Sequence, residues 1–401
     1  MKHRDSILDL VRGLSALLVM LGHLRGFIFL DYDELGGAGV LTKGFYFATG
    51  LGHQAVMVFF VLSGYFVGGS VLSGLTKGSF SWRGYGTARL ARLWTVLLPA
   101  LLLTLGIDLL GQQWNAGAYA GGLIERFMSG PTAAVPAAHD WVTLLGNLGF
   151  VQTVSVPVYG TNGPLWSLAN EFWYYVMFPL IAVGMARFSG MRGRVFAVVQ
   201  AILFALIVSW LPAALLMGGL IWLMGAGVWW LLRMLGVRGQ EDAPASSSAS
   251  SSNQQSSISN RQSIRVIRWF RGWPWRLVGG LLFLGTLAAS KTDHWLGSDG
   301  AVGCAFALWM LSLPGGWRVP GWFNRLVTGL SEISYTLYVV HFPLLFFVAA
   351  VVLKGRQFPA DAEGFLWFGG LTASILAISA GMWWLFERNT DRVRKWLLSG
   401  R

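Results

Sequence analysis

The sequence is poor in the residues on which soluble domains and extracellular disulfide scaffolds depend. Charged residues make up 12% of its 401 residues, against roughly 25% in a typical soluble domain. It holds one cysteine, Cys304, in an apolar run, so no disulfide framework can form and we expect a buried, inert thiol. We also detect no internal repeat, whereas many secondary transporters contain such repeats. Composition therefore excludes an ordinary soluble domain.

What the sequence has instead is hydrophobic residues, which make up 54% of the chain and recur in long runs. A helix needs about 20 apolar residues to cross a hydrocarbon core of about 30 Å. The runs predict an all-α polytopic membrane protein with about ten transmembrane helices. They cover approximately residues 7–30, 51–75, 93–112, 164–186, 195–212, 213–235, 277–292, 298–314, 327–352 and 364–386.

The distribution of lysine and arginine predicts the orientation of these spans. If the N-terminus lies inside, the inward segments carry 24 of the 30 basic residues, as the positive-inside rule requires. We therefore expect both termini to be cytoplasmic. The net charge of +12 follows from this topology, and the scattered basic residues give no reason to expect a nucleic-acid partner.

Two stretches interrupt the predicted single transmembrane domain, which occupies residues 1–401. The cytoplasmic loop 237–276 contains a serine-rich segment, 243–263, with no apolar face to bury, so we expect a disordered linker there. The extracytoplasmic segment 113–163 mixes aromatic, glycine and polar residues, as surfaces that bind polar ligands often do. It is the candidate acceptor-facing cap.

The first span carries two ionisable residues, Arg12 and His23. They are eleven residues apart, so they project from one helix face with a rise of about 16 Å between them. Arg12 can pair with Asp9 or extend to the inner interface. Ionisable groups inside spans mostly face a bundle interior or a cavity and mark function, which makes His23 a candidate functional residue.

The fourth predicted span opens with a polar stripe that contains a carboxylate. Ser167 and Glu171 are followed by Tyr174 or Tyr175, at helical spacing on one face. A carboxylate inside the span needs a partner or a proton. Two roles for Glu171 remain as alternatives. It could pair with a histidine from another span, or it could form an interhelical hydrogen-bond clamp.

The ninth predicted span carries a continuous polar line. Ser331, Ser334, Tyr338 and His341 recur at intervals of three, four and three residues on a helix that is otherwise apolar. This line either joins helices or borders a polar passage, and the sequence favours neither alternative.

Two further motifs belong to the predicted second span and to the cytoplasmic loop that follows it. Arg89 and Arg92 are three residues apart, so they point the same way and could bind phosphates, although positive-inside topology also accounts for them. The second span contains "FFVLSGY", in which the pair Ser63 and Gly64 indicates close helix packing.

Together these motifs resemble the integral-membrane acyltransferase family 3, in the version without a fused hydrolase-like domain. The resemblance runs in order along essentially the whole chain. It rests on Arg12 with His23, "FFVLSGY", Arg89 with Arg92, "LWSLANEFWYYVMFP" with Glu171, "SYTLYVVHFP" with His341, and the closing "LFER" at 385–388.

The resemblance implies a membrane-bound O-acyltransferase of the plasma (inner) membrane. Its donor would be cytoplasmic acyl-coenzyme A, with acetyl as the default acyl group, used as a co-substrate without a bound cofactor or metal. Its acceptor would be a hydroxyl of an extracytoplasmic glycan or glycolipid, such as a surface polysaccharide, lipopolysaccharide or wall glycan.

The resemblance also implies roles for particular residues. His23 would be the catalytic base, and Glu171 would orient it or stabilise its charge. Arg12, Arg89 and Arg92 would hold the donor phosphates. Channel or substrate-lining positions would be Ser63, Ser167, Tyr174, Ser334, Tyr338 and His341. The alternative function is a transporter or flippase for a lipid-linked sugar or small solute, which would use the same buried polar groups as its path.

Overall fold

The computed structural model describes residues 6–37, 39–123, 130–235, 273–292, 294–313 and 320–399. All regular elements in these ranges are helices, and strand-like pairing within them is limited to isolated bridges such as Phe29 with Phe358. Several of the helices are long and apolar enough to span a membrane. The chain is therefore a helical polytopic membrane protein, which confirms the predicted fold class.

Each of the ten predicted apolar runs falls on a helix. In the described part of the chain, seven helical segments meet the length and hydropathy of a membrane span: Ser6–Ile28, Gly52–Thr76, Trp82–Gly122, Gly190–Trp210, Ala213–Met234, Gly321–Val352 and Ala362–Ser399. The remaining three runs are α8 (Leu165–Ala186) and the shorter helices α12 (Trp273–Ala289) and α13 (Asp299–Ser312). The predicted linker 243–263 lies outside the described residues.

The chain divides into two compact units, and the division falls inside three of its helices. We call them unit 1 and unit 2. Unit 1 comprises Met1–Ile7, Met57–Ser79 and Met177–Arg318, and unit 2 comprises Leu8–Val56, Phe80–Val176 and Val319–Arg401.

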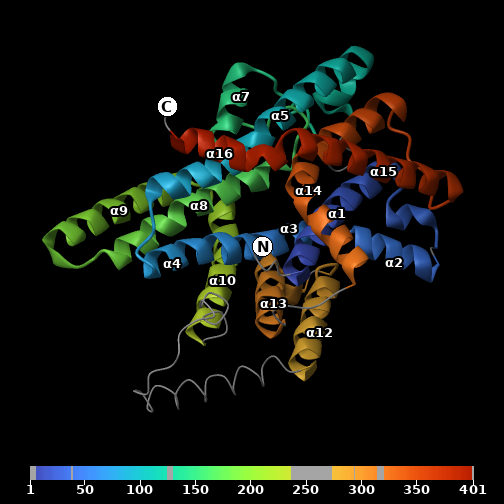
Figure 1. Cartoon of the computed structure of the whole chain (residues 1–401). Helices are drawn as coiled ribbons and strands as arrows, with labels where there is room; N and C mark the ends of the chain where they lie inside the picture. Colours follow the sequence, from blue (N-terminus) through green and yellow to red (C-terminus); the bar gives the residue numbers. More distant parts are fainter. Residues whose placement is uncertain are drawn as a thin grey trace. The chain divides into compact units, whose positions relative to one another are not determined.

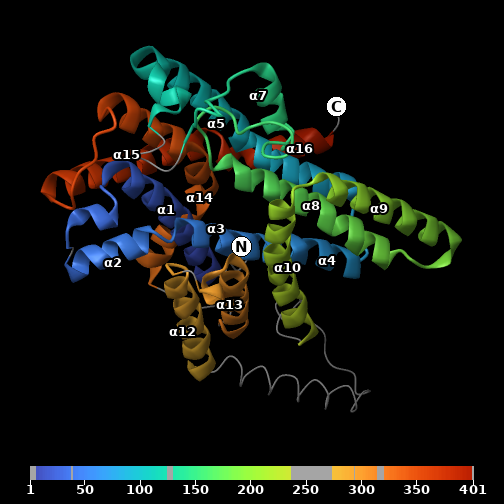
Figure 2. The same cartoon turned by 180° about the vertical axis from the view of Figure 1, so that it is seen from behind.

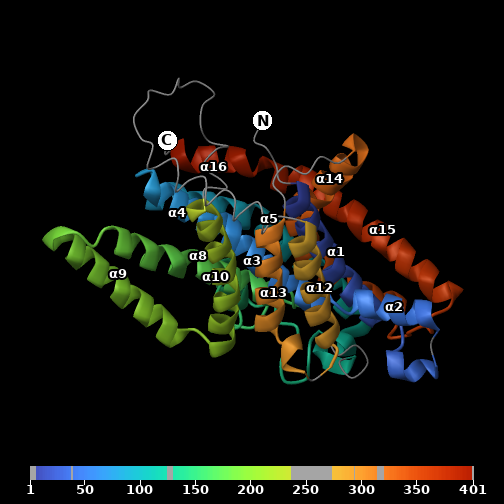
Figure 3. The same ribbon diagram turned by 90° about the horizontal axis from the view of Figure 1, so that it is seen from below.

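Unit 1 is built around α10 (Ala213–Met234), which packs against α13 and against the π-helical segment Gly64–Gly68. Helices α12 and α13 lie side by side in the same unit (Figure 3). The other described helices of unit 1 are the end of α3 (Gly52–Ser63), α4 (Gly69–Thr76), the end of α8 and α9 (Gly190–Trp210).

Glycines allow the close approach of α10 to the "FFVLSGY" segment. A Cβ atom on Gly64 would lie 1.8 Å from the carbonyl oxygen of Trp222, and one on Gly225 would lie 1.8 Å from that of Val61. The indole Nε1 of Trp222 donates a hydrogen bond of 3.1 Å to the hydroxyl of Ser63. The close packing indicated by the Ser-Gly pair is present.

The expected burial of Cys304 is wrong. The cysteine lies on α13 and is exposed at the protein surface. An apolar run does not require burial against protein in a membrane helix, because lipid tails accommodate apolar side chains equally well.

Unit 2 has α14 (Gly321–Phe347) at its centre, packed against α5 (Trp82–Gly117) and α15 (Ala362–Leu385). Helix α1 (Ser6–Ile28) lies alongside α14, to which it is hydrogen-bonded at several levels (Figures 1 and 2). The remaining described helices of unit 2 are α2 (Val40–Thr49), the start of α3, α7 (Trp141–Leu148), the start of α8 and α16 (Thr390–Ser399).

Side-chain caps set the start of several of these helices. Asp140 accepts a hydrogen bond from the backbone N–H of Thr143 at the first turn of α7, and Ser81 accepts one from Gly84 at the start of α5. The bonds from Thr143 lower the pKa of Asp140, because they favour the carboxylate. Asp140 thereby fixes the position of α7 within the predicted outer segment 113–163.

Candidate active site

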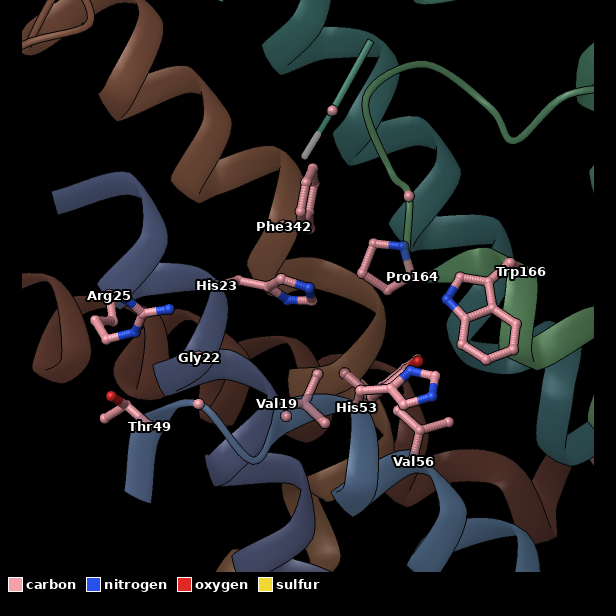
Figure 4. Close-up of a pocket in the computed structure, with 15 residues that line it drawn as sticks. Val19, Gly22, His23, Arg25, Thr49, His53, Val56, Pro164, Trp166 and Phe342 are labelled. Atoms are coloured by element: carbon pink, nitrogen blue, oxygen red, sulfur yellow. The ribbon is translucent and has the colours of Figure 1, made fainter. Parts of the chain in front are cut away.

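A cavity of about 340 Å³ lies within unit 2, which is within the size range of ligand pockets. It is bordered by α1, by the turn between α2 and α3, by the start of α8 and by α14 (Figure 4). Its polar and aromatic wall residues are His23, Arg25, Thr49, His53, Trp166, Tyr338 and Phe342.

The ring of His23 projects from α1 into this cavity (Figure 4). Its Nδ1 atom lies 2.9 Å from Nε2 of His341, and the two rings are stacked at 5.1 Å with an angle of 16° between their planes. Phe342 meets the ring of His23 edge-on at 5.0 Å. Two helices therefore fix the orientation of the imidazole that faces the cavity.

The hydrogen bonds of His341 determine which nitrogens carry protons. Nδ1 of His341 lies 3.0 Å from the backbone carbonyl of Leu337, and a carbonyl can only accept, so Nδ1 is protonated. In a neutral ring Nε2 of His341 is then the acceptor, and it receives the proton on Nδ1 of His23. This assignment, made from the hydrogen-bond partners, leaves Nε2 of His23 with a lone pair that no donor among the described residues occupies.

The polar line of α14 connects the cavity to α8. The hydroxyls of Tyr338 and Ser167 lie 2.6 Å apart, and both side chains are buried. Tyr338 also lines the cavity, one turn from His341. On the same wall Trp166 and His53 have nearly parallel rings whose centroids are 6.5 Å apart.

A buried carboxylate anchors the loop that precedes α8, which lies at the cavity. Asp108 on α5 has no exposed surface and accepts hydrogen bonds from the N–H and the hydroxyl of Thr161, each at 2.8 Å. Its Oδ2 atom also lies 2.9 Å from Nε2 of His139. Asn162 continues the anchor by donating to the carbonyl of Val339 on α14. Gly163, Pro164 and Trp166 then form part of the cavity wall.

A second group of charges lies further toward the start of α1. Arg12 pairs with Asp9 at 3.3 Å and donates to the carbonyl of Ser331 at 3.2 Å. The hydroxyl of Ser331 donates to Asp9 at 2.9 Å. The α14 polar line therefore faces α1, with Ser331 at the level of Arg12 and His341 at the level of His23.

Glu387 extends this charge group beyond α15. It accepts hydrogen bonds from the N–H and hydroxyl of Thr336, at 3.2 and 2.6 Å. The guanidinium groups of Arg92 and Arg12 are both near enough to act electrostatically on Glu387. Two of the three predicted phosphate-binding arginines therefore approach one acidic group.

The third predicted arginine lies beside aromatic rings. The guanidinium carbon of Arg89 is 5.7 Å from the ring centre of Tyr85 and 5.9 Å from that of Tyr175. Tyr175 donates a short hydrogen bond to Glu171, and Tyr85 donates to the carbonyl of Tyr175 at 2.9 Å. Of the two tyrosines left open by the sequence, Tyr175 is thus bonded to Glu171.

The structure separates some of the predicted site residues. Ser63 is in unit 1, where it accepts from Trp222. Ser334 donates to the carbonyl of Ser331 on its own helix, and Tyr174 is buried. The hydrogen-bond partner of His23 is His341, whereas Glu171 bonds Tyr175.

Sequence reasoning did not single out several residues that the structure places at the site. They are Arg25, His53, Trp166, Asp108 and Thr336. Two of them carried a usable signal, because Arg25 is an arginine within an apolar span and Asp108 is an aspartate within another.

Comparison with protein-family models matches residues 5–384 to acyltransferase family 3, which is described as an acyltransferase domain. The match includes the cavity residues and covers parts of both units. No curated protein and no solved structure matches the chain. The chain therefore belongs to this family, and it is a membrane-bound acyltransferase.

Proposed function

We propose that this acyltransferase moves an acyl group, by default acetyl, from acyl-coenzyme A to a hydroxyl of an extracytoplasmic carbohydrate. The acceptor would be a surface polysaccharide, a lipopolysaccharide or a wall glycan. The enzyme would lie in the plasma (inner) membrane with both termini cytoplasmic. Family membership supports the reaction class, and the 24 basic residues on the predicted inner side support the orientation.

The observation that carries this proposal is the free Nε2 lone pair of His23 inside the cavity. A sugar hydroxyl is a poor nucleophile, and a neutral imidazole can remove its proton as it attacks. The hydroxyl oxygen bonds to the thioester carbonyl carbon while Nε2 takes the proton. The carbon–sulfur bond then breaks, and the coenzyme A thiolate takes the proton back from Nε2.

His341 is the positioning residue in this mechanism. It holds the Nδ1–H tautomer of His23, which directs the lone pair into the cavity. His341 thus takes the orienting role that the sequence suggested for Glu171. Glu171, through Tyr175, instead supports the rings beside Arg89.

The donor phosphates would bind at Arg12, Arg89 and Arg92. Arginine forks suit phosphate oxygens, and Nε of Arg89 is buried without a hydrogen-bond partner in the described chain. Arg12 and His23 are separated by about 16 Å of helix rise. An extended pantetheine arm is of comparable length, so this proposal takes direct transfer to the base in preference to an acyl relay.

Of the residues that the resemblance assigns to a channel, we propose that only some border the reaction cavity. The set was Ser63, Ser167, Tyr174, Ser334, Tyr338 and His341. Tyr338 and Ser167 form one wall of the reaction cavity, since their hydroxyls are bonded and Tyr338 lines it. Ser334, like Ser63 and Tyr174, has a packing role in this proposal.

The test supplies isotope-labelled acetyl-coenzyme A to membranes that contain the full chain and identifies the molecule that gains the acyl mass. We expect a carbohydrate to gain the label in the wild type, and His23→Gln to lower the rate by roughly 100- to 10,000-fold. His294→Gln is the matched control, because His294 is exposed and outside the cavity. Unchanged transfer in His23→Gln would remove the base assignment, and label found stably on the protein itself would indicate an acyl relay.

The donor site is tested separately with the double variant Arg89→Ala, Arg92→Ala. We expect its KM for acetyl-coenzyme A to rise roughly tenfold or more, because charge-assisted bonds to phosphate are lost. Arg392→Ala removes an exposed arginine of α16 and serves as the control. A KM unchanged from the wild type would mean that these arginines serve only the positive-inside topology and do not bind the donor.

A further inference from the structure

Arg25 is a charged residue on the cavity wall. It follows His23 by two residues, in the last turn of α1, and both residues line the cavity (Figure 4). Its guanidinium carbon lies 4.9 Å from the ring centre of Tyr46. In the described part of the chain Arg25 forms no ion pair with a carboxylate, and its buried Nε has no hydrogen-bond partner.

Capping the end of α1 does not account for this arginine. A basic side chain in a last turn can bond the final carbonyls of its helix. Here Gln357 donates to the carbonyls of Gly26 and Phe29, and the N–H of Phe358 donates to that of Ile28. These carbonyls are therefore already occupied, and the guanidinium is directed to the Tyr46 ring and the cavity.

No ion pair joins Arg25 to the nearby acidic residues that the structure describes. Asp31 and Glu34 both act electrostatically on Tyr46, and both are exposed. Glu34 instead accepts a hydrogen bond from the N–H of Asp31 at 3.1 Å. An arginine inside a membrane protein with an unsatisfied buried donor calls for an anionic ligand.

We propose that Arg25 recognises an anionic substituent of the acceptor, so that the acylated hydroxyl belongs to a sugar bearing a carboxylate or a phosphate. This inference rests on the proposed function. The ring of Tyr46 holds the guanidinium, whose planar fork matches either oxyanion.

Position along α1 assigns this anion to the acceptor and not to the donor. Arg12 and Arg25 lie on opposite sides of His23 in the helix, with the donor site at the Arg12 end. A donor whose phosphates lie near Arg12 and whose thioester lies at His23 places no phosphate beyond His23. A negative charge at Arg25 must therefore come from another molecule.

The experiment measures binding of three matched ligands to the purified full chain in nanodiscs of zwitterionic lipid, by calorimetry. The ligands are methyl glucoside, methyl glucuronoside and the 6-phosphate of methyl glucoside, which differ only at C6. We expect the wild type to bind at least one anionic sugar roughly 10- to 100-fold more tightly than the neutral one. Arg25→Gln should reduce this ratio to about 1, and Arg25→Lys should give an intermediate value.

Lys43→Gln is the control, because it removes an exposed positive charge from α2 outside the cavity and should keep the wild-type ratio. Thermal unfolding without ligand checks that Arg25→Gln is folded; if it is not, Arg25→Lys carries the test. No charge preference in the wild type, or a preference that survives loss of Arg25, overturns the proposal.

A lipid phosphate is the other source of the same anion. The titration is therefore repeated in nanodiscs that contain phosphatidylglycerol. If Arg25→Gln changes only the stabilisation by this lipid and not the sugar ratio, the anion is a headgroup and the proposal fails. Failure of the proposed function gives a different result: no acyl transfer by the wild type, with the Arg25-dependent charge preference intact.

Discussion

The hydrogen bond between His23 and His341 can be tested by replacing only its acceptor. His341→Leu fills similar space but leaves Nδ1–H of His23 buried without a partner. Losing a partner for a buried donor costs about 1–3 kcal/mol, which disfavours the tautomer that directs Nε2 into the cavity. The competent population, and with it kcat, should fall by roughly 5- to 150-fold.

His341→Gln is the matched variant, because its side-chain oxygen can accept the same proton. We expect it to recover part of the lost rate. KM for acetyl-coenzyme A should stay near the wild-type value in both variants, since His341 does not line the cavity. The assay is initial-rate transfer of labelled acetyl with both substrates varied. If His341→Leu kept kcat within twofold of the wild type, or if Gln and Leu were equally poor, the tautomer argument would be refuted.

Two further predictions concern helix packing in unit 1 and the Asp108 anchor in unit 2. Gly225→Ala should lower the thermal stability of the purified chain by overpacking, since its Cβ would lie 1.8 Å from the carbonyl oxygen of Val61. Gly227→Ala is the control and should keep the wild-type stability, because a Cβ there would have nothing within 4 Å. Equal stability of the two variants would contradict the packing. Asp108→Asn should cost about 1–3 kcal/mol of stability and raise KM for the acceptor, because the two donors of Thr161 bond different carboxylate oxygens and the amide replaces one of these with an NH2 group that cannot accept. A KM unchanged from the wild type would separate this anchor from the cavity.

The helices of this protein were predictable because hydropathy is a local property of the chain. Each apolar run identifies its helix without reference to any other run. The polar line from Ser331 to His341 was predictable for the same reason, since helical spacing alone places these residues on one face. The division into two units was not predicted, because it depends on contacts between distant helices.

Which residues meet across helices could not be read from the sequence. His23 and Glu171 were both recognisable as ionisable groups in spans. The rotation of α14 and α8 about their axes decides that His341, and not Glu171, bonds to His23. That rotation is set by packing, including the close approach of Gly13 on α1 to Leu330 and Ser331 on α14 and the anchor at Asp108.

Residues at the ends of spans were missed for another reason. Arg25 lies in the last turn of its helix, where a basic residue normally indicates an interface. Trp166 and His53 come from segments whose approach depends on the loops before them. Their place on the cavity wall follows from tertiary structure alone.

The backbone carbonyl of Leu337 accepts the last hydrogen bond of the His23–His341 pair, which bears on whether protons can pass along this pair. A carbonyl oxygen cannot relay hydrogen ions, so the pair offers no conduit from the reaction chamber toward the opposite leaflet. We therefore expect turnover by the proposed route to consume no transmembrane gradient. Uncouplers that collapse the proton-motive force should leave the rate with supplied acetyl-coenzyme A unaltered, unlike the rate of a proton-driven carrier.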